Sequence, residues 1–271
     1  MLRTRILTAA VLACILLAGL FLLPPAWGVV AFGAVFTVGA WEWGGFGAPI
    51  TRGARAAYAA GVALLLLLAW KWTARPEHLL LLLGLACLWW VIALAWLIVA
   101  PSRHTPRVLT LLCGPLVLAP AFVALARLLV TTRGFAHGPQ IVLWLVLLVI
   151  SADIGAYFAG RRFGKRKLAP RVSPGKTLEG ALGGLAMVAL VAWAGAVRFG
   201  LPPLEAVAFG CGVGIFSIIG DLTESLFKRA AGLKDSGALL PGHGGLLDRI
   251  DSVTAAAPVY ALGLFGSGAL A

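Results

Sequence analysis

The chain has 271 residues, of which 61% are hydrophobic and only 12% charged, about half the charged share of an ordinary soluble domain. A mean hydropathy of +0.99 and repeated apolar runs long enough to cross a bilayer exclude a soluble globular enzyme. We therefore predict an all-α polytopic membrane protein. In such a protein the basic residues behind the net charge of +12 set the orientation of the helices in the membrane, and no nucleic-acid partner is expected.

Breaks at proline, glycine and charge clusters divide the chain into about nine predicted transmembrane helices. Their expected limits are 5–23, 27–46, 54–73, 77–99, 107–131, 138–160, 178–198, 204–227 and 252–270. The first run follows Arg3 and Arg5 as in a signal peptide, but no small-residue cleavage site follows it, so we expect a retained helix. Five spans make an N-terminal region, 1–137, and four make a catalytic region, 138–271, with polar loops at 161–177 and 228–251.

The distribution of lysine and arginine predicts the orientation of these spans. All but five of the 22 basic residues lie at the N-terminus or follow an even-numbered span. By the positive-inside rule, the N-terminus and both polar loops are cytoplasmic and the C-terminus lies on the opposite side. The five exceptions are Lys71, Arg75, Arg127, Arg133 and Arg198.

Four acidic residues gather near the cytoplasmic ends of even-numbered spans: Glu42, Asp153, Asp221 and Glu224. A carboxylate in or near hydrocarbon is costly unless it is paired, hydrated or bound to a cation. Structural acids placed at random would not collect at one membrane face. The pattern predicts a polar cavity that opens to the cytoplasm, where nucleotides are found.

The segment GDLTESLFKR places Asp221, Glu224, Ser225 and Lys228 at i, i+3, i+4 and i+7, which is one face of a helix. Two acids and a base on one stripe at a membrane boundary suit a divalent metal and a phosphate. The alternative is a self-contained Glu224–Lys228 pair with Asp221 capping another group.

A glycine-rich turn follows in PGHGGLLDRIDS, and after it Asp248 and Asp251 stand at i, i+3 at the expected start of a helix, on one helical face. Glycines let backbone N–H groups converge on an anion, and paired carboxylates with substrate phosphates suit Mg²⁺. His243 and Arg249 would offset negative charge. The alternative is a solvated loop whose aspartates favour a helix N-terminus.

The segment RVSPGKTLEG imitates the end of a Walker A loop, but Pro170 occupies the position of the first glycine and no strand precedes it, so a P-loop is rejected. We expect a helix to start at Ser173 and Pro174, with Lys176, Thr177 and Glu179 available to a nucleotide. Upstream, Asp153 precedes a dense basic run, 161–167, for which contact with anionic lipid headgroups is the alternative reading.

From Ser225 to Asp251 the chain reads SLFKRAAGLKDSGALLPGHGGLLDRID, which closely resembles the C-terminal signature of the phosphatidate cytidylyltransferases, or CDP-diacylglycerol synthases. SPGKTLEG is similar to a second shared stretch, with Gly175 where lysine is common. The resemblance covers roughly the C-terminal half. It implies a reaction of CTP with phosphatidic acid that gives CDP-diacylglycerol and pyrophosphate. It also implies Mg²⁺ as cofactor, with the number of ions open, membrane lipids of a bacterial inner membrane as surroundings, and a homodimer.

Site roles follow from this resemblance together with the patterns above. Metal binding is assigned to Asp221 and Asp248, with Asp251 in or beside the coordination shell. The catalytic candidates are Lys228, Arg229, Lys234, Asp235, His243 and Arg249, and the substrate-binding candidates are Ser173, Lys176, Thr177, Glu179 and Asp153. Two alternative functions are a CTP-dependent lipid-alcohol kinase, which would release CDP, and a transporter, whose charged groups should lie at the membrane midplane.

Overall fold

The computed structural model describes residues 2–47, 50–99, 105–132, 137–240, 242, 244–267 and 269–270, with the backbone alone for residues 2–6. Within these residues lie nine α-helices, one 3₁₀ helix and two short strands. The α-helices are α1 (Leu2–Phe21), α2 (Pro25–Gly44), α3 (Arg52–Trp72), α4 (Pro76–Val99), α5 (Arg107–Leu129), α6 (Gly138–Phe163), α7 (Leu178–Phe199), α8 (Pro203–Ala230) and α9 (Leu247–Gly266). Each overlaps one predicted span, and α2 to α8 are long and apolar enough to cross a membrane. The predicted all-α membrane class is confirmed.

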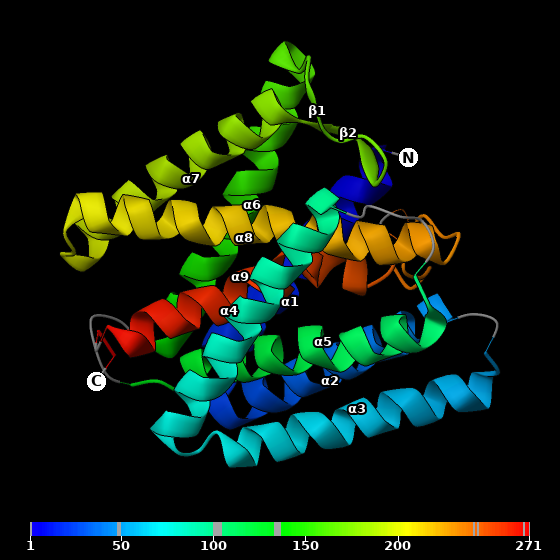
Figure 1. Ribbon diagram of the computed structural model, residues 1–271. Helices are drawn as coiled ribbons and strands as arrows, with labels where there is room; N and C mark the ends of the chain where they lie inside the picture. Colours follow the sequence, from blue (N-terminus) through cyan, green and yellow to red (C-terminus); the bar gives the residue numbers. More distant parts are fainter. Residues whose placement is uncertain are drawn as a thin grey trace.

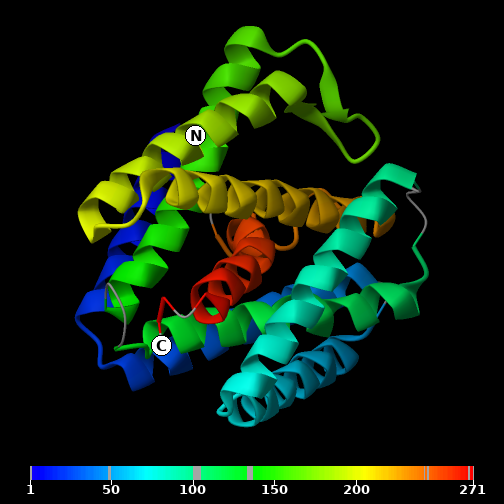
Figure 2. The same ribbon diagram turned by 60° about the vertical axis from the view of Figure 1, so that its left-hand side comes forward.

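The helices pack around α9, which runs through the middle of the bundle (Figures 1 and 2). Helices α2, α3 and α5 lie side by side on one side of it, α8 lies on the other, and α4 also packs against it. The side chains of Ala255, Ala256 and Ala257 on α9 are fully buried. Their small size lets the surrounding helices approach α9 closely.

Helices α6 and α7 cross at glycine. A Cβ added at Gly155 would stand 2.5 Å from the carbonyl oxygen of Gly183, and one added at Gly184 would stand 2.6 Å from that of Ala152. Only residues without a side chain permit two helix backbones to come this near. The pair forms an arm that extends from the bundle and ends in the two strands (top of Figure 1).

These strands correct one prediction. Residues Lys167–Ala169 (β1) and Ser173–Thr177 (β2) form an antiparallel hairpin, so Ser173 and Pro174 do not start a helix. The helix α7 begins at Leu178 instead, because Thr177 has the extended backbone of an N-cap and its Oγ1 accepts a hydrogen bond from the Gly180 amide at 3.1 Å.

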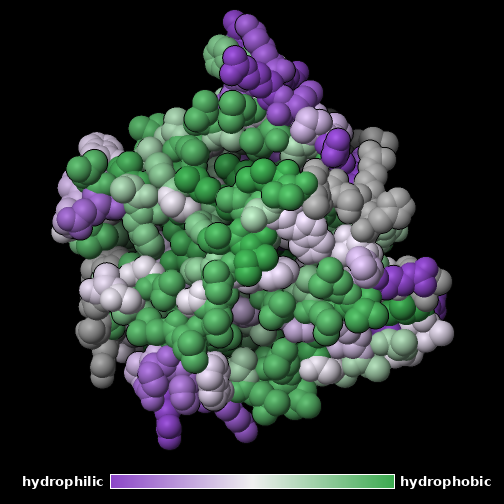
Figure 3. Space-filling view, viewed as in Figure 1, coloured by the Kyte–Doolittle hydropathy of each residue, from purple (hydrophilic) through white to green (hydrophobic). Residues whose placement is uncertain are grey.

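The outer surface of the bundle is largely apolar. Leucines of α3 and α4, among them Leu64, Leu67, Leu81 and Leu85, are exposed. Figure 3 shows apolar residues across the face that it presents, with hydrophilic residues gathered at the edges of that face. The hydrophilic residues are densest at the top, where the arm projects. This distribution is that of a multi-pass membrane protein.

Candidate active site

A buried ion cluster joins the end of α8 to the start of α9. The Nζ atom of Lys228 lies 3.1 Å from Glu224 Oε1 and 2.6 Å from Asp248 Oδ1. All three side chains are at most 8% exposed. The Glu224–Lys228 pair, which was the alternative interpretation of the sequence, is therefore present, and Asp248 extends it to a second helix.

Asp248 also organises the loop before α9. Its Oδ2 accepts hydrogen bonds from the backbone amides of Ser236, at 2.9 Å, and Gly245, at 2.8 Å. Partial burial alone would raise the pKa of Asp248. The Lys228 ammonium and the two amides stabilise the carboxylate more than burial destabilises it, so the pKa lies below its usual value. Asp248 is a fixed anion that holds three donors from different parts of the site.

Asp221 connects the two polar loops predicted from the sequence. Its Oδ2 pairs with Lys176 Nζ at 2.5 Å, and its Oδ1 accepts a hydrogen bond from Ser225 Oγ at 3.3 Å. Lys176 belongs to β2 and Asp221 to α8, so the hairpin is tied to the helix that carries the acidic stripe. Both side chains stay partly exposed, which leaves them accessible to a ligand.

Asp251 lies on α9 beside this stripe. The two helices approach closely, since a Cβ added at Gly220 would stand 2.7 Å from the Asp251 carbonyl oxygen. Burial and then the neighbouring carboxylates Glu224 and Asp221 raise the pKa of Asp251. A cation placed among these acids would relieve their mutual repulsion.

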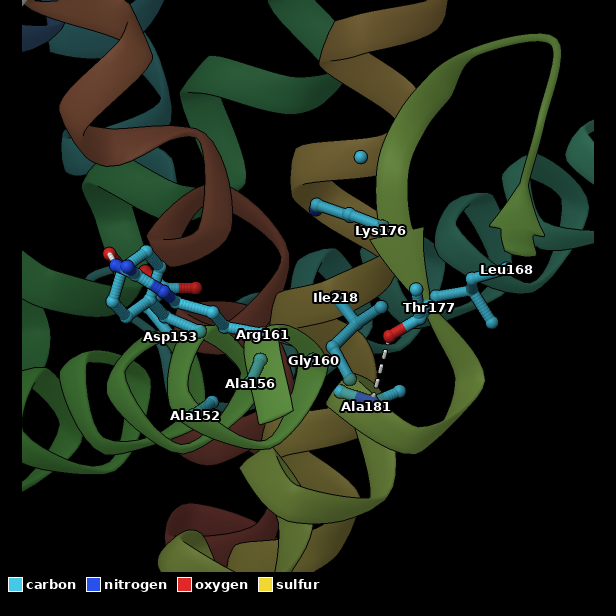
Figure 4. Close-up of a pocket in the computed structure, with 13 residues that line it drawn as sticks. Ala152, Asp153, Ala156, Gly160, Arg161, Leu168, Lys176, Thr177, Ala181 and Ile218 are labelled. Atoms are coloured by element: carbon cyan, nitrogen blue, oxygen red, sulfur yellow. Dashed lines mark hydrogen bonds between the residues drawn. The ribbon is translucent and has the colours of Figure 1, made fainter. Parts of the chain in front are cut away.

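A cavity of about 390 Å³ opens between α6, β2, α7 and α8. Figure 4 shows Asp153 and Arg161 of α6 on one side of it and Lys176 and Thr177 of β2 on the other. Its remaining lining is mostly small or apolar, with Ala152, Ala156, Ala181 and Ile218 among the residues. The cavity therefore combines charged groups with an apolar wall, as an amphipathic substrate requires.

The charged groups at the cavity act on one another. Asp153 and Lys176 line the same cavity, and Lys176 is in turn paired with Asp221. Arg161 Nη1 donates a hydrogen bond to the Tyr157 hydroxyl at 3.0 Å. Three substrate-binding candidates, Asp153, Lys176 and Thr177, are thus brought together.

Other candidates lie outside the cavity lining. Glu179 accepts hydrogen bonds from the Lys165 amide, at 3.0 Å, and the Arg166 amide, at 3.1 Å, so its carboxylate fastens the base of the hairpin. Ser173 lies at the start of β2.

The remaining catalytic candidates lie in or beside the loop between α8 and α9. Lys234, Asp235 and Arg249 are exposed. Arg229 donates a hydrogen bond to the Leu233 carbonyl oxygen at 3.2 Å. His243 lies outside the described residues.

The fit of the site to Mg²⁺ depends on which carboxylate oxygens are available. Among the described residues, no three acidic, histidine or cysteine side chains are grouped closely enough to hold a metal by themselves. Asp221 and Asp248 both have partners on each of their oxygens. They differ in exposure, because the Asp221 side chain is 24% exposed and the Asp248 side chain only 7%. Mg²⁺ commonly uses one or two carboxylates and completes its shell with water and substrate phosphates. Asp221 and Asp251 fit such a site, and Asp248 would join it only if Lys228 moved away.

One acid near the site received no role in the sequence analysis. Glu42, close to the end of α2, contacts Ser236 and the start of α9. Its membership of the acidic group at one membrane face was the only signal in the sequence. Nothing in the local pattern indicates a partner about 200 positions away.

Comparison with known proteins identifies the family of this chain. The model of a family described as the cytidylyltransferase family matches residues 3–265. A phosphatidate cytidylyltransferase of Pseudomonas aeruginosa is 45% identical over 274 residues, covering 99% of this chain and 98% of the relative. A phosphatidate cytidylyltransferase of Haemophilus influenzae is 39% identical over 285 residues, covering 96% and 97%. One of Brucella suis is 48% identical over 134 residues, 46% of each chain.

Proposed function

The chain belongs to the cytidylyltransferase family and is a nucleotidyltransferase, and we propose that it transfers the cytidylyl group of CTP to phosphatidate in the bilayer. The products are CDP-diacylglycerol and pyrophosphate. The observation that carries this proposal is the cavity, which is lined both by charged residues, Asp153, Arg161 and Lys176, and by apolar residues that suit a lipid. The near full-length relatives named for the same activity support it.

In the proposed reaction an oxygen of the phosphatidate phosphate attacks the α-phosphorus of CTP in line. A new phosphorus–oxygen bond forms as the bond to the bridging oxygen of the β-phosphate breaks, and the electron pair leaves with pyrophosphate. The lipid phosphate is already ionised at neutral pH, so the step requires no covalent protein nucleophile. Transfers of this kind depend chiefly on positioning and on neutralisation of charge.

The residues of this chain would supply both the positioning of the substrates and the neutralisation of their charge. Lys176 reaches the cavity from β2 and is placed to bind a nucleotide phosphate once it exchanges Asp221 for that anion. Arg229 and Lys234 lie at the exposed loop, where a leaving pyrophosphate would emerge. Asp221 and Asp251 would hold Mg²⁺, which supplies neutralisation of the phosphates when bound.

We further propose that the protein lies in the inner membrane of a bacterium with its N-terminus and both catalytic loops in the cytoplasm. Most of the basic residues lie at the N-terminus or in the segments that follow even-numbered helices, among them the hairpin after α6 and the loop after α8. By the positive-inside rule these segments are cytoplasmic. This orientation brings CTP to the side on which the cavity lies. The homodimer implied by the sequence resemblance stays a prediction.

The first experiment supplies purified protein with phosphatidate, CTP labelled at the α-phosphorus, and Mg²⁺. Transfer of the label into lipid, its loss after chelation of Mg²⁺, and a large loss in Asp221→Asn would support the proposal. Glu77→Gln, an exposed change in the first turn of α4, is the control that should keep full activity. Release of the label as water-soluble CDP would favour a lipid kinase instead, and untouched CTP would rule out nucleotide chemistry with this lipid.

A further inference from the structure

The carboxylate of Glu42 is enclosed by the loop that precedes α9. Glu42 is 2% exposed. Its Oε1 accepts a hydrogen bond from the Leu246 amide at 3.0 Å, and its Oε2 accepts two, from the Leu247 amide at 2.7 Å and from Ser236 Oγ at 3.0 Å. A residue of the second helix thus contacts both an interior residue of the loop, Ser236, and the junction of the loop with α9, about 200 residues away in the chain.

These contacts cap α9 from another helix. The first amides of an α-helix have no partner within the helix and usually bond to a side chain just before it. Leu246, at the N-cap of α9, has a helical backbone and supplies no such bond. The negatively charged Glu42 takes that place, and an anion at a helix N-terminus is favourable.

Glycines allow the loop to close on this carboxylate. A Cβ added at Gly237 would stand 2.5 Å from Glu42 Oε1, and one added at Gly245 would stand 2.5 Å from Glu42 Oε2. Any larger residue at either position would push the carboxylate or the loop away. The glycines therefore serve the packing around Glu42, in addition to any contact with phosphate.

The end of α2 is a rigid support for this side chain. The neighbouring Trp43 donates a hydrogen bond from Nε1 to the Thr110 carbonyl oxygen at 2.8 Å, and its ring centroid lies 5.2 Å from that of Phe227. Trp43 thereby ties α2 to α5 and α8. The backbone next to Glu42 is therefore anchored to two other helices through Trp43.

We infer that Glu42 is a positioning residue of the active site. By fixing the first turn of α9, it sets where Asp248 and Asp251 stand relative to Asp221 on α8. It is not a group that touches substrate, because its two oxygens are occupied by three donors of the loop. The inference deepens the proposed function and rests on it, since the geometry matters through the transfer reaction.

A carboxylate suits this role better than its amide. The two oxygens of an ionised glutamate only accept, and together they satisfy all three donors. In Glu42→Gln, one oxygen becomes an NH₂ group that faces a backbone amide, which is also a donor. Glu42→Ala removes every contact and leaves the α9 amides without a cap.

The test measures catalysis and local structure together in the full-length protein. Turnover and the KM values for CTP and phosphatidate are determined for Glu42→Gln, Glu42→Ala and the exposed control Glu77→Gln. A displaced reacting geometry lowers kcat by roughly 10- to 100-fold, more in Glu42→Ala than in Glu42→Gln, with both KM values within about threefold of the parent. Ser236→Ala, which loses one of the three bonds, should show a smaller loss.

Amide hydrogen exchange provides the readout that does not depend on activity. Exchange in residues 244–250 should accelerate in both Glu42 variants while α5 and α6 keep their protection, and Glu77→Gln should match the parent throughout. Two results would overturn the inference: kcat within twofold of the parent with unchanged exchange, or acceleration across the whole bundle with kcat falling only as the folded fraction falls. If the parent itself transfers no cytidylyl group, the proposed function fails, and the exchange data still decide whether Glu42 fixes the loop.

Discussion

Replacement of Lys228 by methionine would test the buried ion cluster most directly. Methionine has nearly the same length, so the change removes a charge while it keeps most of the packing. In the parent, the Lys228 ammonium lies 3.1 Å from Glu224 Oε1 and 2.6 Å from Asp248 Oδ1. The variant leaves both carboxylates buried without this cation. Removing one partner of a buried ion pair typically costs about 3–5 kcal/mol, because an uncompensated charge stays behind.

We expect the free energy of unfolding of Lys228→Met to fall by about that amount. The measurement is equilibrium unfolding in detergent micelles, followed by tryptophan fluorescence. Lys71→Met, an exposed change in the last turn of α3, is the matched control and should leave the unfolding curve unchanged.

A double variant separates stranded charge from lost packing. Glu224→Gln added to Lys228→Met removes one of the two stranded acids and should restore part of the lost stability. A Lys228→Met protein as stable as its parent would refute the reasoning. So would a double variant that is less stable than Lys228→Met alone.

Three further predictions concern the hairpin and the arm. Thr177→Val removes the N-cap of α7, and Thr51→Val removes the equivalent cap of α3, so each should lower the free energy of unfolding by about 0.5–2 kcal/mol. Only Thr177→Val should also lower cytidylyl transfer, because Thr177 lines the cavity. Gly155→Ala places a Cβ 2.5 Å from a backbone oxygen of α7 and should lower the free energy of unfolding by about 1–3 kcal/mol. Gly84→Ala, which has open space around it, is the control and should leave that free energy unchanged. Equal stabilities of the two variants would contradict the close crossing of α6 and α7. Glu179→Gln weakens the bonds to the hairpin amides, so trypsin should cut the basic run 161–167 faster than in the parent, and an unchanged cleavage rate would argue against that role.

The helices were predictable because their signal is local. Apolar runs bounded by proline, glycine and charge locate all nine, and α6 starts at Gly138 as predicted. The helix α9 starts at Leu247, five residues before its predicted span, since the polar turn with Asp248 and Asp251 is already helical. Charged residues in a first helical turn do not look like part of an apolar span.

The hairpin and the loop contacts were not predictable in the same way. The strand Ser173–Thr177 is short and polar, and its pairing with Lys167–Ala169 is visible only in three dimensions. The Glu224–Lys228 pair follows from an i, i+4 spacing, but the bond from Lys228 to Asp248 crosses between helices. The contacts of Glu42 join the two halves of the chain, and no periodicity encodes such a pairing.

The central position of α9 has a consequence for how the protein is assembled. A chain is made from its N-terminus, so the described helices α1 to α8 are synthesised before α9, which lies between them. Until α9 arrives, the faces of α4, α5 and α8 that pack against it have no partner, and the amides that Glu42 caps do not yet exist near it. The small, fully buried side chains of Ala255, Ala256 and Ala257 point to different sides of α9 and need little space on any of them. The core and the candidate site are thus completed together when α9 packs against α4, α5 and α8.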